Sequence, residues 1–147
     1  MSAVRATADA QQRLAIDPDR STWVMANAGT GKTHVLTNRI LRLLLGGAAP
    51  QRILCLTFTR AAAAEMRNRL AGRLGRWTLM SDTALSAELA KLAVPSPDSA
   101  TLRRARQLFA HVLDAPGGVH ILTIHAFAQW LLARFPLEAG VAPNAKV

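Results

Sequence analysis

Residues 26–33 carry the sequence Ala-Asn-Ala-Gly-Thr-Gly-Lys-Thr, which has the pattern of a phosphate-binding loop. The loop stands between a β-prone run at residues 22–25 and a helical pattern that begins at Lys32 and stops at Gly46-Gly47. In this order of strand, loop and helix, successive backbone N–H groups and the positive end of the helix dipole point at one anion. The context therefore favours a P-loop of an α/β fold over an ordinary glycine-rich turn.

A P-loop predicts a bound nucleoside triphosphate with Mg²⁺. Lys32 is expected to reach the β and γ phosphates, and the Thr33 hydroxyl is expected to coordinate the metal. The strict pattern begins with glycine, and Ala26 at that position is small enough for the tight turn. The candidate catalytic residues are Lys32 and Thr33. The candidate phosphate-binding residues are Ala26, Asn27, Ala28, Gly29, Thr30, Gly31, Lys32 and Thr33.

Composition limits the remaining choices. The chain has 147 residues and is 50% hydrophobic, which is enough for one domain with a core. Its formal net charge of +9 comes mainly from arginine and favours a polyanionic partner, nucleic acid before membrane, although an ordinary charged surface would look the same. Cys55 is the single cysteine, which argues against a disulfide framework or a cysteine-rich metal site. Because no apolar stretch reaches the length of a signal peptide or membrane span, we expect a cytoplasmic protein that binds no membrane.

The first half of the chain alternates between strand and helix patterns, as a parallel sheet with crossover helices requires. Residues 53–58 are a nearly continuous apolar run, typical of a strand buried on both faces. A helix is expected from Arg60, with its end loosened by Gly72 and Gly75. We assign residues 1–74 to the start of a nucleotide-binding domain.

The second half begins with a change of pattern. Residues 75–118 are expected to form a helical insertion, with one helix near 83–93 and another near 100–113. Residues 119–147 return to the core, with a strand at 119–124 and a final helix that ends before Pro136. The aromatic side chains of that helix, Trp130 and Phe135, are assigned to the core.

Two further segments resemble one family. The sequence LTFTRAAAAEM at residues 56–66 resembles motif Ia of the UvrD/Rep branch of superfamily 1 DNA helicases, and TIHAF at 123–127 resembles its T-x-H-x-F motif. Within that family, residues 22–29 and 135–141 are similar to AddA helicase–nuclease subunits. The resemblance covers essentially the whole chain but only the beginning of the family's length. Arg60 stands where the family usually has asparagine.

The resemblance implies a RecA-like P-loop NTPase sheet with a helical insertion, incomplete at the C-terminus. It also implies an ATP-dependent DNA helicase of double-strand break repair that uses ATP and Mg²⁺, binds single-stranded DNA and duplex ends, and pairs with an AddB-like subunit. Gln12 matches the position where the family's glutamine reads adenine, although Gln11 is an alternative and both side chains resemble ordinary surface glutamines.

The candidate DNA-binding residues are Thr57, Phe58, Thr59, Arg60, Thr123 and His125. They lie at or just after the ends of the expected strands, and the carboxyl ends of parallel strands line the crevice where ligands bind. Phe58 offers an aromatic face on which a base can stack. Without the resemblance to the family, we would favour a core aromatic at this position. For His125, the alternative to a DNA contact is an imidazole that packs near the strand end and has no functional role. A phosphate track and an ordinary charged surface are equally compatible with the arginines Arg67, Arg69, Arg73, Arg76, Arg103, Arg104 and Arg106.

Hydrolysis of ATP needs carboxylates and arginines, and this sequence lacks them in the expected places. No apolar run ends in an Asp-Glu pair. We therefore expect an N-terminal fragment of a longer enzyme that binds ATP without turning it over, with sheet edges that make it poorly soluble. The alternative is a truncated, non-catalytic P-loop module that binds nucleotide or DNA. A small-molecule kinase is disfavoured, because it would need neither TFT nor T-x-H.

Overall fold

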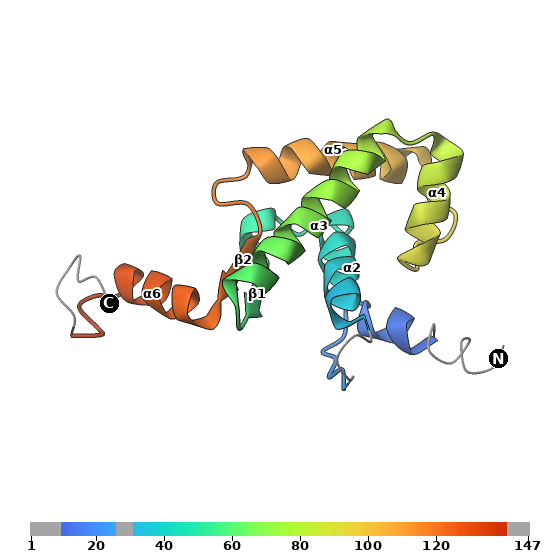
Figure 1. Cartoon of the computed structure of the whole chain (residues 1–147). Helices are drawn as coiled ribbons and strands as arrows, with labels where there is room; N and C mark the ends of the chain where they lie inside the picture. Colours follow the sequence, from blue (N-terminus) through green and yellow to red (C-terminus); the bar gives the residue numbers. More distant parts are fainter. Residues whose placement is uncertain (1–9, 26–30, 141–147) are drawn as a thin grey trace.

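A computed structural model describes residues 10–25 and 31–140 (Figure 1). A helical segment over residues 10–15 comes first. The elements after it are α2 (Lys32–Leu45), a 3-10 turn η1 (Pro50–Arg52), β1 (Leu54–Thr57), α3 (Arg60–Leu79), α4 (Asp82–Lys91), α5 (Ser99–Asp114), β2 (His120–Thr123) and α6 (Ile124–Arg134). The expected helices and the two later strands are therefore confirmed, and the fold is α/β.

The two strands pair in parallel, with Leu54 opposite His120 and Thr57 opposite Thr123. A parallel pair needs a long crossover connection, which here consists of α3, α4 and α5. The strand expected at residues 22–25 is not formed, because neither strand of the described two-stranded sheet lies beside that segment to pair with it. A full RecA-like sheet stays a prediction.

Helix α3 is the centre of the packing. It contacts α2, α5 and both strands, and it crosses in front of α2 in Figure 1. The expected loosening at Gly72 and Gly75 is wrong, because the helix continues to Leu79. Leu74 and Trp77 are fully buried in its last turns, and Gly75 lies where α5 packs closely, so tertiary burial outweighs the low helix propensity of glycine.

Strand β1 is buried on one face only, which corrects the expected burial on both. Leu54 and Leu56 remain 46% and 42% exposed, since α3 covers only the opposite face. On the covered face, the Cys55 sulfur lies 3.3 Å from the Met66 sulfur. Burial raises the pKa of the Cys55 thiol, which is free. The apolar run therefore predicted the strand correctly but predicted its burial incorrectly.

Helix α6 packs mainly against the two strands. None of its side chains is buried among the described residues, and Trp130 and Phe135 are 38% and 49% exposed. The assignment of these two aromatics to the core is therefore wrong. The Trp130 ring instead stacks on Phe127, with centroids 5.9 Å apart, and the Arg134 guanidinium lies 4.9 Å from the Trp130 centroid.

Ser81 begins α4, and replacing it by alanine is expected to destabilise the chain by about 1 kcal/mol. Its hydroxyl oxygen accepts a hydrogen bond from the Ala84 backbone N–H at 3.3 Å, which satisfies one of the free donors of the first turn. Urea unfolding of both proteins measures the change. Ser86→Ala, which removes a hydroxyl from the middle of the same helix, is the matched control and should not destabilise. An equal loss in both variants would contradict the capping role.

Candidate functional site

The first candidate site lies at the N-terminus of α2. Gly31 precedes the helix in the left-handed conformation, with φ 85° and ψ 17°, a region that glycine enters without strain. Among the described residues no side chain caps this helix, and its first turn has no acidic residue, whereas Thr59, Ser81, Asp98 and Thr123 cap the helices from α3 to α6. The end of α2 is therefore suited to an anion. The other candidate loop residues, 26–30, lie outside the described residues.

A cavity of about 370 Å³ adjoins this helix end. Gln11, Gln12 and Lys32 line it together with apolar side chains that include Trp23 and Val35. The fold thus brings both candidate adenine-reading glutamines to the same cavity as Lys32. A few polar groups among apolar walls is the usual composition of a small-molecule site of this size. Thr33 is half-buried in the first turn of the helix.

Arg39 holds the glutamine segment against α2, and the sequence analysis did not identify it. Its guanidinium donates to the carbonyl oxygens of Ala15 at 3.1 Å, Asp17 at 2.6 Å and Arg20 at 2.5 Å. Ala15 and Ile16 are buried against Val35 of the helix. These contacts fix the path from Gln12 toward the loop. The only signal in the sequence was an arginine beside the apolar stripe of α2.

The second candidate site is the carboxyl edge of the sheet. The register places Thr57 directly opposite Thr123, so motif Ia and the T-x-H motif end at one edge. Thr59 caps α3 by accepting from the Ala62 N–H at 3.1 Å, and Thr123 caps α6 in the same way. In Figure 1 this edge lies toward the same end of the molecule as the start of α2.

The candidate DNA-binding side chains at this edge differ in exposure. Phe58 is 88% exposed, so the alternative assignment to a strand core is wrong. Arg60 and His125 are also exposed. Thr57 is half-buried, and its hydroxyl lies within donating distance of the Thr59 carbonyl oxygen at 3.1 Å and of the Leu122 carbonyl oxygen at 3.4 Å. The edge therefore presents an aromatic ring, a guanidinium and an imidazole to solvent, and the threonines mainly shape the backbone.

Several of the clustered arginines hold the fold. Arg67 donates to the Ile121 carbonyl oxygen of β2 at 2.7 Å. Arg104 donates to the Leu45 carbonyl oxygen at 3.4 Å, and Arg106 forms an ion pair with Asp82 at 2.6 Å. The fold therefore does not arrange all of these arginines as one continuous row of phosphate contacts.

The described residues contain no group of three or more histidine, cysteine or acidic side chains placed to hold a metal ion. In the same part of the chain, no helix has the length and apolarity needed to cross a bilayer.

Comparison with known proteins identifies the family. Residues 7–147 match the UvrD/REP helicase N-terminal domain. The chain is similar to the AddA-type ATP-dependent helicase/nuclease subunit of Lactobacillus acidophilus, with 32% identity over 93% of this chain and 10% of the relative. The corresponding subunits of Pelotomaculum thermopropionicum and Levilactobacillus brevis are 37% and 39% identical over 84% and 76% of the chain, and 8% and 7% of their own lengths. The chain thus spans at most about a tenth of these relatives, and it belongs to the UvrD/REP helicase family.

Proposed function

We propose that this chain forms the first part of the ATPase domain of an ATP-dependent DNA helicase of the AddA type, which acts in double-strand break repair. The observation that carries the proposal is the parallel register of β1 and β2, which puts Thr57 opposite Thr123 and joins two motifs at one edge. Both motifs then lie toward the end of the molecule where α2 begins. A motor needs nucleotide and DNA to bind near one another, and this arrangement meets that need.

The nucleotide in this proposal is ATP with Mg²⁺. The uncapped start of α2, the left-handed Gly31 and the cavity shared by Gln12 and Lys32 fit a phosphate chain followed by a base. Lys32 would hold the β and γ phosphates, Thr33 would hold the metal, and the Gln12 amide would donate to and accept from the adenine edge. The bound metal supplies charge neutralisation at the transferring phosphoryl group.

The DNA in this proposal is a single strand at the sheet edge. Phe58 stacks on a base, and Arg60 and His125 contact the backbone, a combination that does not depend on base sequence. Thr57, Thr59 and Thr123 keep the edge in place through the contacts of their hydroxyls. Duplex ends and an AddB-like subunit would engage the intact protein, in the cytoplasm.

The domain division that goes with this proposal assigns residues 1–74 and 119–147 to the ATPase core and residues 75–118 to an insertion. Helix α3 crosses the first of these boundaries without a break. The insertion, which contains α4 and α5, is therefore continuous with the core.

The proposal predicts ATP turnover that single-stranded DNA stimulates in the intact protein and that is lost in the 147-residue chain alone. The reason is that water positioning and transition-state stabilisation require carboxylates and arginines beyond the P-loop. A coupled phosphate-release assay with and without oligonucleotide measures both. Absence of stimulation in the intact protein would favour a non-catalytic nucleotide- or DNA-binding module. Robust turnover by the chain alone would contradict the fragment interpretation.

A further inference from the structure

A second pocket, of about 590 Å³, lies between α2, α3 and α4. Four cationic side chains line it, Arg69, Arg73, Arg76 and Lys91, together with one carboxylate, Glu88. Its described lining contains neither an aliphatic side chain nor a phenyl or indole ring, in contrast to the cavity beside Lys32. The pocket is therefore built for charge and not for a base or an acyl chain.

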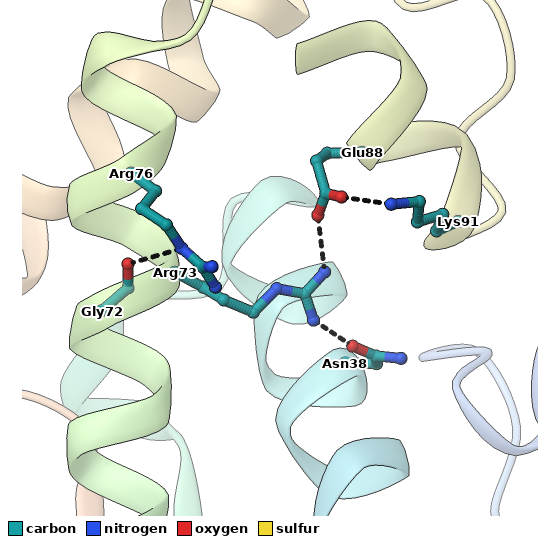
Figure 2. Close-up of polar contacts among 6 residues, drawn as sticks. All are labelled: Asn38, Gly72, Arg73, Arg76, Glu88 and Lys91. Atoms are coloured by element: carbon teal, nitrogen blue, oxygen red, sulfur yellow. Dashed lines mark hydrogen bonds and ion pairs between the residues drawn. The ribbon is translucent and has the colours of Figure 1, made fainter. Parts of the chain in front are cut away.

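The four cations of this pocket contact two acids, and one of these contacts is the ion pair of Arg69 with Glu65 at 2.5 Å. Arg73 donates to the Asn38 amide oxygen and pairs with Glu88 at 3.4 Å, and Lys91 pairs with the same carboxylate (Figure 2). Arg76 uses its Nε to donate to the Gly72 carbonyl oxygen at 3.3 Å. Within the described part of the chain no acidic side chain pairs with Arg76, so this residue lines the pocket as a cation without a matching acid.

Two titratable groups of the pocket have lowered pKa values, and burial is the main cause in both. The pKa of His34 is lowered by its burial and by the charges of Arg73 and Arg69. The pKa of Arg73 is lowered by burial, and Arg76 adds to that effect against the pull of Glu88. An anion in the pocket would oppose the contributions of the neighbouring arginines, but not that of burial.

We propose that this pocket binds a phosphodiester group of a nucleic-acid backbone and that duplex DNA supplies it. The inference rests on the proposed function. Guanidinium and ammonium groups are the side chains that contact backbone phosphates, and such contacts carry no sequence information. Single strands also need stacking surfaces, which this pocket lacks and the Phe58 edge provides.

The position of the pocket along α3 suits a junction between single strand and duplex. Arg60 begins this helix at the sheet edge, and Arg69 to Arg76 lie further along it. At about 1.5 Å per residue the separation along the axis is roughly 15–25 Å. The pocket is therefore near enough for a DNA molecule that contacts the edge to contact the pocket as well.

The test is duplex binding by the intact protein in a Lys32→Ala background without nucleotide, which removes any contribution of the P-loop lysine. Arg76→Gln is expected to weaken duplex affinity and to reduce the slope of log affinity against log salt by about 0.9, the value for one phosphate contact. A short single strand should bind equally to both proteins. Arg103→Gln removes the same charge from an exposed position on α5 and should leave the duplex slope unchanged.

An unchanged slope for Arg76→Gln would overturn the inference. The same holds if Arg103→Gln lowers the slope equally, since that indicates diffuse charge, or if the single strand loses as much affinity as the duplex. ATP turnover in the protein that retains Lys32 reports separately on the proposed function. Failure of the pocket and failure of the helicase assignment are therefore distinguishable.

Discussion

Replacing Lys32 by alanine in the intact protein is expected to lower ATP turnover by roughly 10²–10³-fold, the usual cost of losing one preorganised group that stabilises transition-state charge. Lys32 is an exposed residue that opens α2, and it lines the cavity with Gln12. Its ammonium would neutralise charge on the β and γ phosphates during transfer. Unwinding driven by that turnover should disappear with it. Phosphate release and strand-separation assays measure the two effects.

The control is Arg42→Ala, which removes a cation from the last turn of the same helix. Arg42 is far from the start of α2, so turnover and unwinding should be retained in this variant. The free energy of unfolding of each variant shows whether a loss of turnover is local or follows from unfolding. Substitution of an exposed residue such as Lys32 usually changes this free energy by no more than about 0.5 kcal/mol. Wild-type turnover in Lys32→Ala would remove the lysine from its proposed role, and so would an equal loss in Arg42→Ala.

The parts of the fold that could be predicted are those set by local pattern. The helical stripe after the loop predicted α2, and its glycine stop predicted the end at Leu45. The threonines of the two motifs predicted strand ends, and Thr59 and Thr123 serve there as helix caps. Because crossover connections make neighbouring strands parallel, the meeting of both motifs at one edge also followed from the sequence.

The parts that could not be predicted depend on which segments pack together. An apolar run predicts a strand, but whether that strand is buried on one face or on both depends on the elements that pack against it. Leu54 and Leu56 stay 46% and 42% exposed, because α3 covers only the opposite face. Arg39 bonds to three carbonyl oxygens of a distant segment, and no local pattern records such contacts. Gly72 and Gly75 predicted a helix end. In α3 the burial of neighbouring side chains such as Leu74 outweighs the low helix propensity of these glycines.

The same limit applies to the charged residues. Seven clustered arginines look alike in the sequence, yet Arg67 bonds to a strand carbonyl, whereas Arg76 faces an open pocket. Distance to a partner decides between the two roles, and that distance exists only in the folded chain. The candidate phosphate contacts therefore reduce to the few cations without a matching acid.

Phe58→Ala is expected to weaken binding of a short single-stranded oligonucleotide by about 1–3 kcal/mol, the loss of one base–aromatic stack. This corresponds to roughly a 5- to 150-fold rise in Kd. Phe58 is 88% exposed at the carboxyl edge, so its ring has a face available for a base and little packing to lose. Fluorescence anisotropy with a labelled oligonucleotide measures the affinity, and urea unfolding should show no comparable loss of stability.

Phe135→Ala is the matched control, because it removes an equally large and half-exposed ring at the far end of α6. Its oligonucleotide affinity should equal that of the wild type. An equal loss in both variants indicates general apolar adhesion and argues against a stacking site at the edge. A stability loss of about 3–5 kcal/mol in Phe58→Ala, the usual cost of deleting a core phenylalanine, would instead return this residue to the interior. Because the two outcomes affect different measurements, affinity and unfolding together decide which role Phe58 has.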